Sequence, residues 1–143
     1  MKRVILESDL KSIAQKIIDK VEKTKSTKAK VIALHGDLGV GKTTLTKQIL
    51  SILNPKAKTK SPTFVIMRRV DIDYKKISTV IHIDAYRLKN GEDLVKLGFK
   101  EILQDPKNLI ILEWPEIVSK LLPKNTLHIF LKHRGREERE VFF

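Results

Sequence analysis

The sequence contains no cysteine, so disulfide bonds and zinc sites built on cysteine are excluded. It also has no apolar run close to the ~20 residues that cross a bilayer. The basic start, residues 1–3, is followed by only three apolar residues before Glu7. That run is shorter than the ~7–15 apolar residues of a signal peptide. We therefore expect a cytoplasmic protein with no membrane contact.

Internal repeats, low-complexity tracts and long linkers are absent too, and 143 residues match the size of one domain. We expect a single domain over residues 1–143. The charge is uneven, with 29 Lys and Arg against 17 Asp and Glu, a net charge of +12. Such an excess is typical of chains that contact nucleic acid, but also of lysines spread over a solvated surface. Both interpretations stay open.

Hydrophobic periodicity predicts helices that alternate with strands. Apolar residues at i, i+3 and i+4 spacing follow Ser8, which we expect to cap the first helix. The run at residues 31–34 is fully apolar, as in a buried parallel strand. The predicted helices cover residues 10–21, 43–53, 92–97 and 115–122, and the predicted strands cover residues 31–34, 63–70, 79–83, 109–112, 126–132 and 138–143. This order predicts an α/β fold with a mixed, mostly parallel sheet, flanked by helices and extended by antiparallel hairpins at residues 71–76 and 134–136.

A glycine-rich segment between the first predicted strand and the helix at residues 43–53 matches G-x-x-x-x-G-K-[ST] at every fixed position. Its glycines allow a tight turn whose N–H groups surround phosphate oxygens, and the helix directs its positive end at the same anion. In such a P-loop, Lys42 reaches the β- and γ-phosphates and the Thr43 hydroxyl binds Mg²⁺. We expect the nucleotide-binding residues to be Gly36, Asp37, Leu38, Gly39, Val40, Gly41, Lys42, Thr43 and Thr44.

The base preference follows from an absent motif. Guanine-specific P-loop proteins carry an Asn-Lys-x-Asp base reader, and none of the asparagines in this sequence is followed by lysine. The expected ligand is therefore ATP rather than GTP.

Two carboxylates stand where apolar strands should end: Asp84 after residues 79–83, and Glu113 after residues 109–112. Because ligands gather at the carboxyl ends of strands in open α/β sheets, both could face the phosphates. A capping or surface role remains the alternative for each.

Three further side chains are ambiguous on their own. Thr63 lies in Ser61-Pro62-Thr63, between the P-loop helix and the next strand, where switch threonines of P-loop proteins occur, but the tripeptide also reads as a turn. His82 alternates with apolar neighbours, as a buried histidine would. Trp114, the single tryptophan, is interpreted as a packing residue by default.

Together these segments resemble the TsaE family, P-loop ATPases of bacterial tRNA threonylcarbamoyladenosine synthesis. Five segments appear in the family's order: the P-loop of residues 36–44, in which the family commonly has alanine at position 40; Ser-Pro-Thr-Phe at 61–64; His-Ile-Asp-Ala-Tyr-Arg-Leu at 82–88; the leucine-glycine segment within 92–101; and Glu-Trp-Pro-Glu at 113–116.

The resemblance implies roles for these residues. Thr43 and Glu113 would hold Mg²⁺, Asp84 would position or activate water, and Thr63 would sense the γ-phosphate. It also implies that the protein works with TsaD and TsaB, where ATP hydrolysis resets the modifying complex, while threonylcarbamoyl transfer belongs to TsaD. A weak contact with tRNA is compatible with the charge.

Two rival functions remain at this stage. A small-molecule kinase would share the P-loop, although no lid segment with paired arginines is evident. A nucleotide-gated RNA-binding module would use the net positive charge, with hydrolysis incidental.

Overall fold

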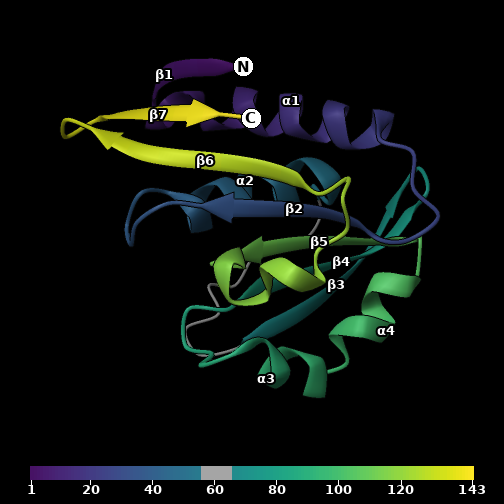
Figure 1. The fold of residues 1–143 in the computed structure, drawn as a ribbon. Helices are drawn as coiled ribbons and strands as arrows, with labels where there is room; N and C mark the ends of the chain where they lie inside the picture. Colours follow the sequence, from purple (N-terminus) through teal and green to yellow (C-terminus); the bar gives the residue numbers. More distant parts are fainter. Residues whose placement is uncertain (56–65) are drawn as a thin grey trace.

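The computed structural model describes residues 1–55 and 66–143. One seven-stranded sheet runs through it in the order β1-β7-β6-β2-β5-β4-β3 (Figure 1). The strands are β1 (Lys2–Leu6), β2 (Lys30–His35), β3 (Met67–Tyr74), β4 (Ile77–Asp84), β5 (Asn108–Glu113), β6 (Leu127–Arg134) and β7 (Glu138–Phe142). The helices are the 3₁₀ turn η1 (Glu7–Asp9), α1 (Leu10–Lys23), α2 (Lys42–Leu53), α3 (Gly91–Lys96), α4 (Phe99–Gln104) and the 3₁₀ segment η2 (Pro115–Leu121).

The centre of the sheet is parallel and its edges are antiparallel. β2 pairs in parallel with both β5 and β6, and β4 pairs in parallel with β5. β3 adds to one side as a hairpin with β4, while β7 and β1 extend the other side. β5 has no exposed position, because both of its faces are covered. A strand in such a place needs a nearly continuous apolar sequence, which residues 109–112 provide. The predicted α/β fold, with a mixed sheet flanked by helices and extended by antiparallel hairpins, is confirmed. Three of the six strand pairs in the described residues are parallel and three are antiparallel, so the sheet is less parallel than predicted.

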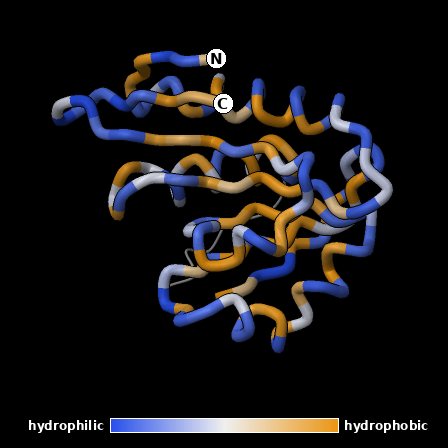
Figure 2. The backbone as a smooth tube through the Cα atoms, in the orientation of Figure 1, coloured by the Kyte–Doolittle hydropathy of each residue, from blue (hydrophilic) through white to orange (hydrophobic). Residues whose placement is uncertain are grey.

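Helices cover both faces of the central strands. α1 and α2 pack on one face, where Ile13, Ile17 and Ile49 join the side chains of β2 and β6 in one core. α3, α4 and η2 cover the other face around Phe99 and Leu94. In Figure 2 the central strands and the sheet-facing side of α1 are hydrophobic. The two ends of the chain meet at the sheet edge, where the Met1 ammonium donates to the Phe143 carbonyl at 2.5 Å.

Several local predictions were wrong. Ser8 lies inside η1 rather than capping α1, because the chain enters the helix through this 3₁₀ turn and Asp9 accepts the Leu6 N–H instead. The hairpin of β3 and β4 keeps its strand structure through Tyr74, so its turn contains only Lys75 and Lys76. β1 and α4 were not predicted. The first part of the strand predicted at residues 63–70 lies outside the described residues.

None of the helices in the described ranges combines the length and the apolar character needed to traverse a bilayer.

Candidate functional site

The glycine-rich loop connects the end of β2 to the start of α2. Gly36 has φ +151°, and a Cβ there would lie 2.6 Å from the Leu131 carbonyl oxygen of β6. Gly41 has φ +114° immediately before α2, a conformation that disfavours any residue with a Cβ. Glycine is therefore required at both ends of the loop, first for close packing on β6 and then for the turn into the helix.

Lys42 is the first residue of α2 and is 5% exposed. Its Nζ donates to the carbonyl oxygens of Gly36 and, at 2.9 Å, of Asp37, so the side chain folds back over the loop. Burial lowers the Lys42 pKa, while the nearby carboxylates, Glu113 and then Asp84 first among them, act in the opposite direction. A buried ammonium at the mouth of the loop gains from any anion that replaces its lost hydration.

Glu113 ends β5 and is 2% exposed. Its Oε1 accepts a hydrogen bond of 3.1 Å from the Thr43 hydroxyl, which joins the end of β5 to the first turn of α2. Its Oε2 lies 2.6 Å from Nε2 of His82, itself 7% exposed on β4. A buried carboxylate needs such partners, and here they set its orientation.

Asp84 stands beside Glu113 because β4 and β5 are parallel and these two residues pair in the register. The Asp84 Oδ1 accepts from the Tyr86 N–H at 3.1 Å, so part of its hydrogen-bonding capacity holds the turn after β4. The carboxyl ends of β4 and β5 thus present two acidic side chains at the same edge as the P-loop.

Trp114 follows Glu113 with φ +60°, which turns the chain from β5 into η2. Its ring lies 4.1 Å from Lys42 Nζ, measured to the centroid, and 5.0 Å from the Tyr86 ring. A cation at this distance from an indole is stabilised by the ring quadrupole. The tryptophan is therefore a packing residue, as its default interpretation has it, and the group it packs against is the lysine of the site.

Within the predicted loop, the side chains separate by exposure: Leu38 is 69% exposed, whereas Val40 is 1% exposed and belongs to the core. Of the predicted catalytic residues, Lys42 and Asp84 lie at this edge, together with the predicted metal ligands Thr43 and Glu113. Thr63 lies outside the described residues.

Arg139 of β7 was missed as a neighbour of the loop. Its Nε donates to the Val40 carbonyl at 3.0 Å, and one terminal nitrogen donates to the Glu138 carbonyl at 2.9 Å. The sequence marks Arg139 only as one of several basic residues near the C-terminus, because nothing in the spacing relates it to a loop 99 residues earlier.

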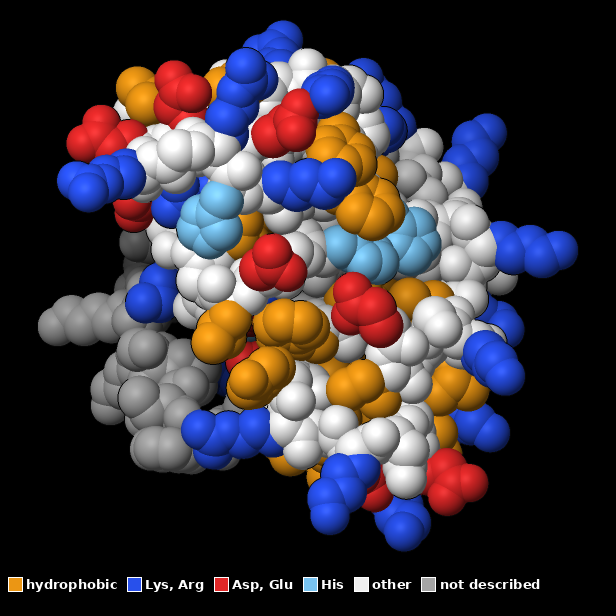
Figure 3. Space-filling model, turned by 60° about the vertical axis from the view of Figure 1, so that its left-hand side comes forward, with side chains coloured by type: hydrophobic (Ala, Val, Ile, Leu, Met, Phe, Trp, Pro, Cys, Tyr) orange, Lys and Arg blue, Asp and Glu red, His pale blue; other side chains and the backbone are white. Residues whose placement is uncertain are grey.

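His35, the last residue of β2, forms a second contact group beside the loop. Its Nε2 shares a 2.8 Å hydrogen bond with Nδ1 of His128, and its Nδ1 lies 3.3 Å from the Glu116 carboxylate. Its ring stacks on Phe130 at 4.3 Å. Burial lowers the His35 pKa, and Glu116 opposes that effect. On the face drawn in Figure 3, histidines lie next to hydrophobic and acidic side chains.

A buried parallel strand, a glycine-rich loop and a helix beginning at its lysine define the class as a P-loop α/β protein. The sequence model described as "Threonylcarbamoyl adenosine biosynthesis protein TsaE" matches residues 6–141. The chain therefore belongs to the TsaE family, as the resemblance predicted.

Curated relatives carry the name "tRNA threonylcarbamoyladenosine biosynthesis protein TsaE". The chain is similar to those of Rickettsia bellii (36% identity over 103 residues, 71% of this chain and 68% of the relative) and Bacillus subtilis (33% over 113 residues, 79% and 68%). The match covers only 60% of the Rickettsia conorii relative and 57% of that from Rickettsia felis. Among solved structures, the crystal structure of Bacillus subtilis YdiB matches with a TM-score of 0.69 and 27% identity, covering 99% of this chain and 82% of that one.

Proposed function

We propose that this protein binds ATP with Mg²⁺ in the P-loop, hydrolyses the ATP, and thereby supports threonylcarbamoyladenosine modification of tRNA. The observation that carries the proposal is the hydrogen bond between the Thr43 hydroxyl and the Glu113 carboxylate, directly beside the P-loop lysine. The family and the names of the relatives support the pathway.

The side chains at this edge suit a magnesium nucleotide. Mg²⁺ prefers oxygen ligands and keeps several waters, and a threonine hydroxyl beside a carboxylate is a donor set of that kind. Thr43 and Glu113 would hold the ion, directly or through water, and Mg²⁺ would neutralise charge on the β- and γ-phosphates. His82 occupies the other Glu113 oxygen, which leaves Oε1 directed at Thr43.

Lys42 would bind the β- and γ-phosphates, while the loop of residues 36–44 surrounds them with N–H groups. To reach a phosphate, Nζ exchanges its bonds to the Gly36 and Asp37 carbonyls for a stronger, charge-assisted one. Asp84 would accept a hydrogen bond from the attacking water and orient it. Thr63 is proposed to sense the γ-phosphate from the segment outside the described residues.

The proposed partners are TsaD and TsaB, on which ATP hydrolysis would act. The pathway assignment supports a tRNA-modifying complex, and the family resemblance supplies these two proteins as its members. In this proposal the chain contributes the nucleotide cycle and no part of the transfer chemistry.

A substitution of Lys42 tests the proposal. Lys42→Ala should weaken ATP binding at least tenfold, about 1.4 kcal/mol, and abolish phosphate release, because it removes the ammonium group that would bind the β- and γ-phosphates. Lys47→Ala, which removes a lysine from the same helix α2, is the matched control. Calorimetry measures binding, phosphate release measures turnover, and circular dichroism verifies folding.

Unchanged ATP affinity in a folded Lys42→Ala variant would contradict the assignment of the loop. Transfer of the γ-phosphate to a small acceptor, without release of phosphate to water, would favour a kinase instead.

A further inference from the structure

A cavity of about 980 Å³ lies at the edge of the sheet opposite the P-loop. It is bordered by the first residues of β2 and β4, the end of α1, and the connection from α4 to β5. β2 begins at this cavity and ends at the P-loop, so its six residues separate the two places by roughly 17 Å. The cavity is therefore distinct from the nucleotide site.

Lysine dominates the lining of this cavity. Over the described ranges 1–55 and 66–143, six lysines contribute to it, against a single acidic residue, Glu22. We call this group the lysine pocket; its lysines are Lys23, Lys25, Lys30, Lys75, Lys76 and Lys107. With six lysines and one glutamate, the lining has a formal net charge of +5, while the whole chain has +12. The pocket therefore gathers a large share of the positive charge on one concave surface.

Glu22 is already fully engaged. One of its oxygens accepts from the Tyr74 hydroxyl and the other from Lys75 Nζ, both at 2.6 Å. These two hydrogen bonds, that of Lys75 first, lower the Glu22 pKa and keep it ionised. The single carboxylate of the lining is thus bonded to Lys75 and also acts electrostatically on Lys30, so the six lysines of the pocket face one negative charge.

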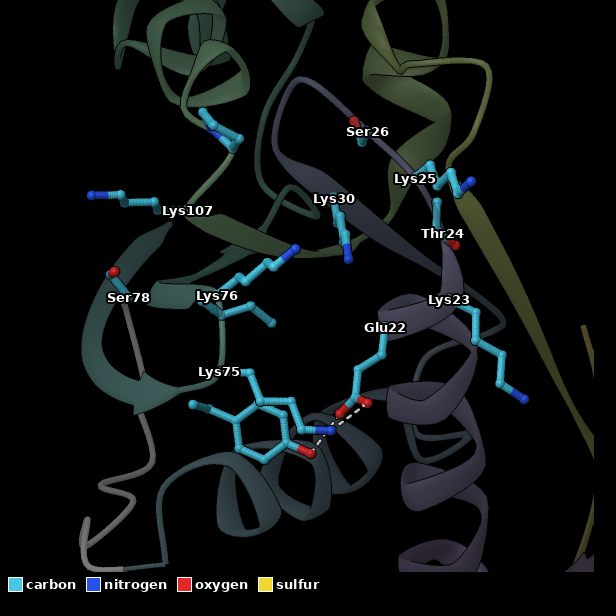
Figure 4. A pocket seen from close by; sticks show the side chains of 13 residues that line it. Glu22, Lys23, Thr24, Lys25, Ser26, Lys30, Lys75, Lys76, Ser78 and Lys107 are labelled. Atoms are coloured by element: carbon cyan, nitrogen blue, oxygen red, sulfur yellow. Dashed lines mark hydrogen bonds and ion pairs between the residues drawn. The ribbon is translucent and has the colours of Figure 1, made fainter.

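The other lysines differ in direction. In Figure 4, Lys30 and Lys76 point toward one another across the cavity, while Lys23 and Lys107 project outward. Lys30 is half-buried at the start of β2, and no ion pair involves Lys30 or Lys76 within residues 1–55 and 66–143. Two ammonium groups that converge with no carboxylate bonded to either of them repel each other, and an anion between them offsets that repulsion.

The chemistry of the lining selects the kind of anion. A single fixed phosphate or carboxylate is usually held by arginine forks or by a row of backbone N–H groups, and no arginine is among the described residues that line the pocket. Lysines are point charges on flexible stems, which suit a chain of regularly spaced phosphates. Tyr74 is the one aromatic residue in the described part of the lining, and its hydroxyl is bound to Glu22, so this part offers no stack of rings for bases.

We infer that the lysine pocket binds the phosphate backbone of RNA, with little dependence on base sequence. RNA carries one negative charge per nucleotide, so a few consecutive phosphates can span the inward and outward lysines together. The geometry of the pocket supports this inference independently of the proposed function. Only the choice of tRNA as the first probe rests on the proposed function. ATP hydrolysis can therefore fail as a proposal while this one holds.

The test uses fluorescence anisotropy of a labelled tRNA transcript and of an unrelated RNA hairpin, titrated with the full chain at several salt concentrations. Lys30→Gln combined with Lys76→Gln should weaken binding of both RNAs severalfold and reduce the slope of log K against log salt by about two. A second double variant, Lys76→Gln with Lys107→Gln, changes two exposed lysines of the pocket and leaves the half-buried Lys30 intact. It should show the same loss of affinity and of salt dependence.

The matched control is Lys11→Gln with Lys100→Gln, which removes the same charge from exposed positions on α1 and α4 outside the pocket. Its slope should stay close to that of the unsubstituted chain, and ATP affinity should be the same in all three double variants. Equal losses in the control and the pocket variants would overturn the inference, because net charge alone would then explain binding. Tighter binding to polyglutamate than to RNA would overturn it in favour of an acidic protein partner.

Discussion

Lys42 Nζ lies 4.1 Å from the centroid of the Trp114 ring, so the lysine of the P-loop and the single tryptophan of the chain are in direct contact. The contact joins the first residue of α2 to the residue after β5. Trp114 reaches it through its left-handed backbone conformation, and Tyr86 covers part of the same ring. Any ligand that moves the ammonium group also changes the electric field at the indole.

This contact predicts that Trp114 fluorescence changes when MgATP is added. A phosphate that draws Nζ from the ring and from the Gly36 and Asp37 carbonyls alters the surroundings of the indole. Fluorescence titration measures the change, and it should saturate at the affinity found by calorimetry. A constant signal during proven binding would place the tryptophan outside the influence of the nucleotide.

The second prediction separates the two carboxylates. Glu113→Gln should weaken nucleotide binding in Mg²⁺ but leave binding in EDTA nearly unchanged, because it removes a charge opposite the divalent cation. Asp84→Asn should keep affinity within a few-fold and depress turnover more strongly. Calorimetry with and without Mg²⁺, together with phosphate release, measures both.

Glu116→Gln is the matched control for these carboxylates. It makes the same chemical change three residues beyond Glu113, where the side chain contacts His35 rather than Thr43. Affinity and turnover should therefore stay near those of the unsubstituted chain. If Asp84→Asn lost the Mg²⁺-dependent affinity and Glu113→Gln lost only turnover, the two roles would be exchanged.

Much of this site could be predicted from the sequence because its parts follow local patterns. Lys42 and Thr43 belong to a contiguous motif, while Asp84 and Glu113 each follow an apolar strand, and parallel pairing of β4 and β5 brings those ends together. The hydrogen bond from Arg139 to Val40 follows no such pattern. It depends on the pairing of β7 with β6, which brings the Arg139 side chain within reach of the loop and which only the folded chain determines.

The secondary-structure elements divide in the same way, into those that follow a local sequence pattern and those that depend on distant parts of the chain. β2 was predicted because a fully buried strand needs an apolar run, whereas β1 buries only Ile5 and owes its pairing to β7 at the far end of the chain. α4 was missed because the predicted helix over residues 92–97 ends directly before Gly98, a residue that commonly terminates helices. Gly98 does end the stretch after α3, yet with φ +90° it also starts the six-residue helix that follows.

The third prediction concerns pH. Burial holds the His35 pKa below its ordinary value of 6.5, so the unfolded chain takes up the proton more readily than the folded one. The contribution of His35 to stability is then complete above about pH 6.5 and is lost as the pH falls toward the pKa of the folded state. Glu116 limits the loss, because its carboxylate favours the charged form of His35.

His35→Gln should therefore flatten the dependence of the urea midpoint on pH between about 7 and 5. His133→Gln, at an exposed histidine of β6, serves as the control and should keep the original slope. Equal slopes in the unsubstituted chain and His35→Gln would show that other groups cause the acid sensitivity.

The last prediction is that the isolated chain hydrolyses ATP slowly and that TsaD and TsaB together accelerate it. Efficient P-loop hydrolysis needs a positive charge on the transition state, often an arginine, which is worth ~10³–10⁵ in rate or roughly 4–7 kcal/mol. Arg87 is the in-cis candidate, because it lies three residues beyond Asp84, but it is exposed in the turn after β4. We expect Arg87→Ala to change the basal rate less than tenfold, with Arg136→Ala, an exposed arginine between β6 and β7, as its control. Phosphate release measured with and without the two partners tests the acceleration. Fast hydrolysis by the chain alone that is indifferent to the partners and lost in Arg87→Ala would instead identify Arg87 as an internal arginine finger.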